Sequence, residues 1–299
     1  MSKSSATTAT KHGQAHALKR VRGADGVSLT YRELGSGEPV LLLHGWPTSS
    51  YLWRNVMPAI AARNRVLALD LPGFGGSDKP LDADYGFGFF ERAIDSFLAE
   101  LGIDRLALAA HDVGGPVAVH WAAARPERIT KLALLNTLVY PEFSPAVLEF
   151  IKACTTPELR EQLTSRAGLA SVMKLGVADE ASLSDEVIAV VAEPFGDEHA
   201  RLALARAGAG LELSGFEETA AALPTLRMPV RVVYGEQDRI LPDVGDTFAR
   251  LQRDVPQARI TALAGCGHFL QEEEPQRVGE LLAEFLAPEH PRLALQAIG

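Results

Sequence analysis

The stretch Leu106-Ala-Leu-Ala-Ala-His-Asp-Val-Gly-Gly-Pro-Val-Ala-Val-His-Trp121 decides how this chain folds. It begins with five apolar residues, as expected of a strand that is buried on both faces of a parallel sheet. Gly114 and Gly115 allow close backbone approach, and Pro116 suits a first helical turn because that position needs no N–H donor. The apolar run after Pro116 predicts the helix itself. Strand, sharp turn and helix together form the setting that holds a reactive side chain at the top of a sheet.

The residue at the tip of this turn is an acid. A turn of this kind ordinarily carries serine between glycine-containing flanks, whereas the register here is Ala110-His-Asp-Val-Gly114. A carboxylate in that place is suited to attack an sp³ carbon that carries a leaving group or a strained ring oxygen, and the product is an alkyl ester of the protein. The alternative is that Asp112 only caps the following helix, since aspartate is favoured at that position. We expect covalent chemistry at Asp112.

Composition limits the class of protein. A chain of 299 residues with 47% hydrophobic content can bury a large core in one domain with an insertion. The formal charge of −9 argues against nucleic acid and anionic membranes as partners. No apolar run approaches the roughly 20 residues that span a bilayer, and two cysteines are too few for a disulfide framework, so we expect a buried free thiol at Cys266. The sequence predicts a cytoplasmic protein that is a monomer or a homodimer.

The alternation of strands and helices sets the predicted domains. Residues 1–17 are polar and rich in Ser, Thr and Ala, which predicts a disordered leader. In residues 18–138 and 224–290, short apolar runs alternate with helical stretches, which is the pattern of an α/β core with a mostly parallel sheet flanked by helices. Residues 139–223 are rich in Ala, Leu and Glu and contain no buried strand, so we expect an inserted helical lid. Residues 291–299 form a C-terminal tail.

Three chemically active residues follow predicted strands of the core. Asp112 lies at the turn, Asp238 follows the strand at 230–234, and His268 follows the strand at 258–263. We expect them to meet, because functional loops gather at the carboxyl ends of parallel strands. The order nucleophile, acid, histidine is also the order found on α/β-hydrolase scaffolds.

From about Val27 to the last helix, the chain resembles the α/β-hydrolase superfamily. The segments 44–55, 72–80 and 111–115, which read HGWPTSSYLWRN, PGFGGSDKP and HDVGG, resemble haloalkane dehalogenases and, nearly as well, epoxide hydrolases. The segment Gly235-Glu-Gln-Asp-Arg239 matches the loop that carries the family's acid in one dehalogenase subgroup. The resemblance implies a small apolar substrate that is attacked by Asp112, followed by hydrolysis of the ester.

The resemblance also implies a role for each remaining candidate. Another subgroup places its acid as a glutamate after the preceding strand, but this chain has Asn136 there, so Asp238 is the expected acid. It would orient His268, which deprotonates water, and the backbone N–H groups of Trp46 and Val113 would form the oxyanion hole. Besides substrate and water no partner is expected, and no cofactor or metal. The candidates for the substrate pocket are His44, His111, Asn136, Tyr140, Phe143 and Phe269.

The residues that would stabilise the leaving group differ from those of both families. Dehalogenases usually hold the halide between two side-chain N–H donors, one from a tryptophan directly after the nucleophile, where this chain has Val113. The second donor is an asparagine after His-Gly, where this chain has Trp46, or a tryptophan from the lid, and residues 141–224 contain no tryptophan. The indole N–H of Trp46 can donate once. Epoxide hydrolases usually place tyrosine hydroxyls in the lid, but no tyrosine follows Tyr140 there. Other candidate donors in the lid are His199, Lys152, Thr155 and Thr156.

Two classes of function therefore remain open. The first is a hydrolase that opens carbon–halogen or carbon–oxygen bonds through an ester of Asp112, as in haloalkane dehalogenases or, alternatively, epoxide hydrolases. The second is a small-molecule binding protein of the same fold whose turnover is lost or redirected. The fold alone does not choose between them. The retention of Asp112, Asp238 and His268 favours the enzyme, because a binding protein has no need of all three.

Overall fold

The computed structural model describes residues 17–23 and 26–288, so the predicted leader (apart from residue 17) and the C-terminal tail lie outside the described residues. An eight-stranded sheet has the order β1-β2-β4-β3-β5-β6-β7-β8. β1 and β2 run antiparallel to their neighbours, and the other strands are parallel to one another. This mostly parallel sheet confirms the predicted fold class. The strands are β1 (Leu18–Arg22), β2 (Ser28–Gly35), β3 (Glu38–Leu43), β4 (Asn64–Leu69), β5 (Leu106–His111), β6 (Ile129–Leu135), β7 (Val230–Gly235) and β8 (Arg259–Leu263).

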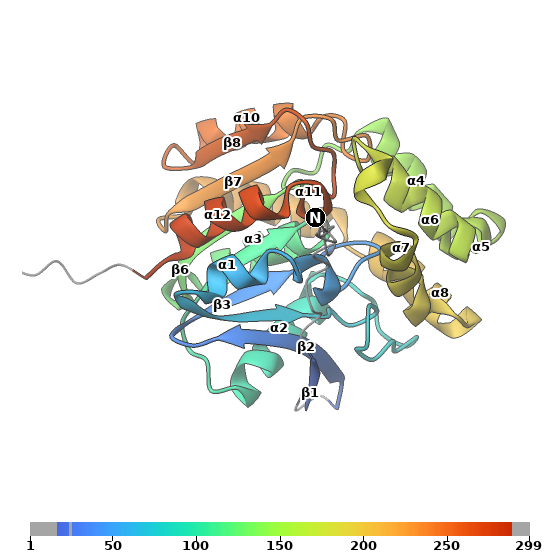
Figure 1. Ribbon diagram of the computed structural model, residues 1–299, viewed down its shortest axis with the longest axis horizontal. Helices are drawn as coiled ribbons and strands as arrows, with labels where there is room; N and C mark the ends of the chain where they lie inside the picture. Colours follow the sequence, from blue (N-terminus) through green and yellow to red (C-terminus); the bar gives the residue numbers. More distant parts are fainter. Residues whose placement is uncertain (1–16, 24–25, 289–299) are drawn as a thin grey trace, which may run out of the picture.

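Helices cover both faces of the sheet (Figure 1). The helices α1 and α12 pack against each other and share one apolar core with one face, whereas α2, α3 and α10 share a second core with the other. Alternate residues of each buried strand enter opposite cores because side chains along a strand alternate in direction. These helices are α1 (Met57–Ala61), α2 (Phe87–Glu100), α3 (Gly114–Ala124), α10 (Val244–Asp254) and α12 (Pro275–Leu286), with the short α11 (Leu270–Glu273) before α12.

Residues 139–223, all of which the structure describes, contain helices and no strand. Figure 1 shows α4 to α8 beyond the tips of the parallel strands, where they cover the edge that carries the loops of the site. Four of these helices begin after a serine or aspartate whose side chain accepts a backbone N–H, which is a local signal for a helix start. The lid helices are α4 (Pro145–Thr155), α5 (Pro157–Thr164), α6 (Arg166–Leu175), α7 (Asp185–Ala192), α8 (Glu198–Ala209) and α9 (Leu213–Ala222).

Two elements near the N-terminus differ from the sequence expectation. The sequence predicts one helix from Ser49 or Ser50 to about Ala62, but the structure has a 3₁₀ turn, η1 (Ser50–Trp53), followed by α1. Pro58 lies in the first turn of α1, and proline starts a helix more readily than it continues one. β1 was not predicted, because its residues are mostly exposed and lack an alternating apolar pattern. The other 3₁₀ turns are η2 (Pro126–Arg128), η3 (Glu180–Ser182), η4 (Glu193–Phe195) and η5 (Leu223–Thr225).

Two expectations from composition concern the described part of the chain. In residues 17–23 and 26–288, no helix combines the length and apolarity needed to cross a bilayer. Cys154 and Cys266 are both buried and form no disulfide, which confirms the expected free thiol at Cys266.

Candidate active site

The turn between β5 and α3 holds Asp112 in an unusual backbone conformation. Its φ is +50°, in the left-handed region that residues other than glycine rarely adopt. The Thr137 hydroxyl donates to the carbonyl oxygen of Asp112 at 2.6 Å, and a Cβ on Gly115 would collide with Thr137. Strand β5 is buried over its whole length, so the start of the turn is fixed by the sheet. The sequence therefore builds a strained elbow that exposes one carboxylate at the sheet edge.

The structure brings the three predicted residues into one line. Nε2 of His268 lies 3.5 Å from Oδ2 of Asp112, and Nδ1–H of His268 donates to Oδ2 of Asp238 at 2.8 Å. The side chains of His268 and Asp238 are fully buried, while Asp112 stays 15% exposed toward the cavity. Oδ1 of Asp238 accepts the backbone N–H groups of Ile240 and Leu241, both at 2.8 Å. The acid is thus held on two sides and can fix the orientation of the imidazole.

Asn136 supports the acid and does not line the cavity, in contrast to the sequence expectation. Its Nδ2–H donates to Oδ2 of Asp238 at 2.8 Å, and its Oδ1 accepts the backbone N–H of Gly235 at 3.0 Å. It follows β6, whose neighbour β7 leads to Asp238, so the sheet places the two side chains together. The residue at the position of the other subgroup's glutamate therefore orients Asp238.

The charges of the three residues stabilise one another. Burial disfavours the imidazolium of His268, but the carboxylates of Asp238 and Asp112 outweigh it and raise the pKa of His268 to about 10. Burial likewise opposes the charge of Asp238, but His268 and the hydrogen bond from Asn136 lower the pKa of Asp238 to about 2. The pKa of Asp112 is also lowered despite its burial, because His268 faces it. Asp112 is therefore an ionised carboxylate at neutral pH, which is the form a nucleophile needs.

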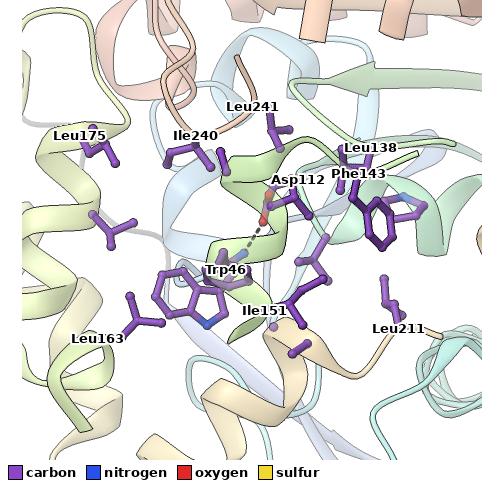
Figure 2. Close-up of a pocket in the computed structure, with 18 of the residues that line it drawn as sticks. Trp46, Asp112, Leu138, Phe143, Ile151, Leu163, Leu175, Leu211, Ile240 and Leu241 are labelled. Atoms are coloured by element: carbon purple, nitrogen blue, oxygen red, sulfur yellow. Dashed lines mark hydrogen bonds between the residues drawn. The ribbon is translucent and has the colours of Figure 1, made fainter. Parts of the chain in front are cut away.

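Two backbone donors point at the carboxylate of Asp112. The N–H of Trp46 donates to Oδ1 at 2.7 Å (Figure 2), and the N–H of Val113 is a second donor to the carboxylate. A Cβ on Gly45 would overlap the Asp112 side chain, so only glycine permits this approach. These N–H groups lie where an oxyanion would develop if the carboxyl carbon of Asp112 became tetrahedral.

A cavity of about 260 Å³ opens between core and lid at Asp112. Figure 2 shows Leu163 and Leu175 on one side of Asp112, with Phe143 and Leu211 on the other. All four residues belong to the inserted segment, and nearly all other lining residues are also apolar. Such a cavity is suited to a small apolar molecule.

Among the predicted pocket residues, only Phe143 lines the cavity. His44 is fully buried, and its Nε2 accepts the backbone N–H of Leu71 at 3.1 Å. His111 is also fully buried, and its Nε2–H donates to the carbonyl oxygen of His268 at 2.9 Å. The two histidines hold the loops beneath the site, and their positions in the sequence, before Gly45 and Asp112, do not reveal this.

Tyr140 and Phe269 also point away from the cavity. The Tyr140 hydroxyl donates to Asp254 at 2.6 Å, and its ring lies under the guanidinium of Arg250. Phe269 is fully buried, and its ring packs edge-on against His268 at 5.0 Å. Proximity in sequence to a site residue therefore failed as a guide, because successive side chains leave the backbone in different directions.

The leaving-group side of the cavity has few donors. The indole N–H of Trp46 donates to the carbonyl oxygen of Leu204 at 3.1 Å, so it is not directed at a substrate, contrary to the sequence expectation. Val113 has no side-chain donor. Among the described residues of the wall, Arg239 is the remaining polar one besides Asp112 and Trp46, and its Nε and Nη2 donate to the carbonyls of Leu175 and Lys174 at the end of α6. Sequence analysis missed Arg239, although it directly follows Asp238.

The four other lid residues considered as donors do not line the cavity. His199 Nε2–H donates to the carbonyl of Lys79 at 2.8 Å, and the Thr155 hydroxyl donates to a carbonyl of its own helix. Lys152 is largely exposed, and Thr156 is the residue just before α5. The expectation that one of these four residues stabilises the leaving group is therefore wrong, because none of them reaches the cavity.

Comparison with known proteins agrees with this fold. A family model described as alpha/beta hydrolase fold matches residues 38–185. A haloalkane dehalogenase from Mesorhizobium japonicum is 31% identical over 275 residues, which cover 87% of this chain and 88% of the relative. A soluble epoxide hydrolase from a Corynebacterium species is 28% identical, covering 88% and 95% of the two chains. The crystal structure of a putative ancestral haloalkane dehalogenase superimposes with a TM-score of 0.78 at 31% identity, covering 90% of this chain and 98% of that one.

Proposed function

Because this chain belongs to the α/β-hydrolase superfamily, we propose that it hydrolyses a small apolar electrophile through a covalent alkyl ester of Asp112. One observation carries the proposal: an ionised Asp112 faces an apolar cavity while His268, held by Asp238, lies 3.5 Å behind it. A binding protein would gain nothing from burying two carboxylates and a histidine in this line, since buried charges are costly to desolvate.

In the first step, Oδ2 of Asp112 attacks the substrate carbon. Oδ1 is occupied by the N–H of Trp46, so Oδ2 is the oxygen that remains available. The new bond joins Oδ2 to the carbon, and the leaving group departs with the bonding electron pair. The apolar walls exclude water, which strengthens the nucleophile by removing its hydration.

Formation of the ester prepares the second step. Alkylation removes the charge of Asp112, which is one of the two carboxylate charges that raise the pKa of His268. The imidazolium therefore releases its proton more readily, and neutral His268 can take a proton from water. The hydroxide attacks the carboxyl carbon of Asp112, and the charge that develops on Oδ1 is stabilised by the N–H groups of Trp46 and Val113. The bond between the carboxyl carbon and Oδ2 then breaks, the alcohol leaves with Oδ2 and the proton that His268 returns, and one water oxygen stays in Asp112.

The cavity wall favours substrates with good leaving groups. In the described part of the chain, the side-chain donors on the wall are the Trp46 indole and the Arg239 guanidinium, and both already donate to lid carbonyls. Bromide and iodide need less stabilisation than chloride, so bromoalkanes and iodoalkanes are the proposed substrate class. An epoxide requires a proton donor for its oxygen, and the absence of a tyrosine from this wall disfavours that alternative.

Isotope labelling and trapping test the proposal. A single turnover of 1-bromohexane in ¹⁸O-water should place the label in the peptide that contains Asp112. The variant His268→Gln should release one bromide per protein and retain a hexyl ester on the same peptide. Asp112→Asn is the matched control, in which this peptide should carry neither the ¹⁸O label nor the ester. Styrene oxide is tested in parallel: diol formation without halide release from any bromoalkane or iodoalkane would favour the epoxide hydrolase. An adduct on another residue would contradict Asp112 as the nucleophile, and no adduct with any electrophile would favour the binding protein.

A further inference from the structure

A second concave site lies at the amino ends of the parallel strands, opposite to the carboxyl ends where Asp112 lies. It has a volume of about 500 Å³ and is bounded by the first residues of β7 and β8, by β6 and by the C-terminal half of α12. The strands β6 to β8 point toward the lid in Figure 1, so this site lies at their far ends. Four cationic side chains line it, together with one carboxylate, Glu284. We call the four the basic groove: Lys131, Arg227, Arg231 and Arg259.

Sheet register brings three of the four cations together. Arg231 of β7 is the direct cross-strand partner of Arg259 of β8, and it also pairs with Ala133 of β6. Lys131 lies two residues before Ala133, so its side chain is on the same face as the two arginines. This is the face that α12 covers, and Nζ of Lys131 donates to the carbonyl of Ala287 just beyond the end of that helix. Three neighbouring strands therefore present positive charge to one concave surface.

In the described part of the chain, three of these cations donate to carbonyl or hydroxyl oxygens, and all four lack the close carboxylate partner that partly buried cations have elsewhere in the molecule. Arg54, Arg65 and Arg125 each lie within 4.0 Å of a carboxylate oxygen. Within residues 17–23 and 26–288, no carboxylate lies within that distance of any member of the basic groove. Arg231 is partly buried, and its Nη2–H donates to the Thr261 hydroxyl at 2.6 Å. Burial lowers the pKa of Arg231, the carboxylate of Glu284 opposes that shift, and the charge of Arg259 adds to it. Like charges directly opposite each other on adjacent strands destabilise a sheet. Glu284 offsets part of this repulsion, and a bound anion would offset more of it.

We propose that the basic groove binds a small anion that carries two or more phosphoryl groups. Guanidinium forks match phosphate oxygens in pairs, and adjacent forks on paired strands suit adjacent phosphoryl groups. The ring of Phe285 and the side chain of Leu281 close the groove on its helical side, so the ligand is compact. A long polyanion such as nucleic acid is disfavoured, because the protein as a whole carries a formal charge of −9. The site is separate from Asp112 and does not depend on the proposed hydrolysis.

Titration calorimetry with pyrophosphate tests this proposal on the complete chain at low salt. We expect saturable one-to-one binding that weakens as salt is added, with orthophosphate bound at least about tenfold more weakly because it engages fewer forks. Arg259→Gln should weaken binding by about tenfold, and Arg231→Gln/Arg259→Gln should weaken it further. The matched control Arg63→Gln/Arg166→Gln has the same loss of charge at exposed positions outside the groove and should bind like the wild type.

A second measurement separates a site from a structural role. If the like charges are held together for a ligand, Arg259→Gln should raise the thermal stability of the ligand-free protein, and the same concentration of pyrophosphate should stabilise the wild type more than this variant. Absence of pyrophosphate binding would overturn the proposal, as would equal loss in the groove and control variants. Tighter binding of a single-stranded oligonucleotide than of pyrophosphate would overturn the choice of ligand.

Discussion

The core side and the lid side of the cavity are built by different interactions. On the core side, Asp112, Asp238 and His268 are held by directional hydrogen bonds and by the register of neighbouring strands. On the lid side, the cavity wall consists almost wholly of apolar side chains, and Leu148 and Leu159 of the same helices are 53% and 37% exposed. Helix α5 buries only Thr164. The comparison teaches that the core fixes the chemistry, whereas the lid can change its side chains without breaking the catalytic geometry.

Neutralising Asp238 should cause the largest loss of activity, because this residue belongs to the core side of the cavity. In Asp238→Asn the amide can no longer hold His268 in the required tautomer, and ester hydrolysis should fall by up to about 10⁴-fold. Formation of the ester needs only Asp112, so the first turnover should survive. Rapid-quench measurement should show a burst of one bromide per protein followed by a very slow phase. Loss of the burst together with the slow phase would place Asp238 in the first step instead.

Adding a donor on the leaving-group side should produce the next largest effect. Removing one preorganised donor typically lowers kcat by about 10²–10³-fold. If the cavity accepts the ring, Val113→Trp should therefore raise the turnover number for 1-chlorohexane by up to about that factor. Val113→Phe is the matched control, since it adds aromatic bulk without an N–H. Overpacking would appear as a lower melting temperature in both variants. Equal chloride release by the two variants would show that bulk rather than hydrogen bonding limits the reaction.

The pH dependence of stability should distinguish the charged core side from the rest of the molecule. The folded pKa of His268, about 10, lies above its unfolded value of about 6.5, so its contribution is complete below pH 6.5 and is lost as pH rises toward 10. The folded pKa of Asp238, about 2, lies below its unfolded value of about 3.9, so its contribution is lost as pH falls from about 4 toward 2. The difference in unfolding free energy between wild type and Asp238→Asn should therefore be largest between about pH 4 and 6.5. Denaturant titrations across pH measure it, and a difference that grows above pH 7 would contradict the assigned charges.

The smallest effect is expected for Trp46→Phe, which tests where the indole N–H points. The backbone N–H that contacts Asp112 is retained, so bromide release should change by less than about threefold. The carbonyl of Leu204 loses its donor, and the unfolding free energy should fall by about 1 kcal/mol. Kinetics and denaturant unfolding of the same sample check both. A rate loss of a hundredfold with unchanged stability would instead assign the indole to the leaving group.

The core side of this comparison is also the side that sequence reasoning could reach. Asp112, Asp238 and His268 each follow an apolar strand, and parallel strands bring such positions to one edge regardless of their distance along the chain. The directions of Asn136 and Tyr140 could not be obtained in this way, because they depend on which contact each side chain finds. The bond from the Trp46 indole to Leu204 joins segments 158 positions apart and leaves no local pattern. The pairing of Arg231 with Arg259 required strand register, which apolar runs do not specify.

Arg239 has a mechanical consequence for how substrates enter. Its guanidinium bonds to the carbonyls of Lys174, Leu175 and Val177, so the loop that carries the acid is clamped to the end of α6. The N–H of Phe269, next to His268, adds a bond to the carbonyl of Gly176 at 3.0 Å. Both catalytic loops therefore share one anchored corner with the lid, and that corner must act as the hinge side of any opening. In the proposed reaction, substrate and product would then pass on the far side, where α4 and α5 meet solvent and no comparable clamp ties them to the loops of Asp238 and His268 in the described part of the chain.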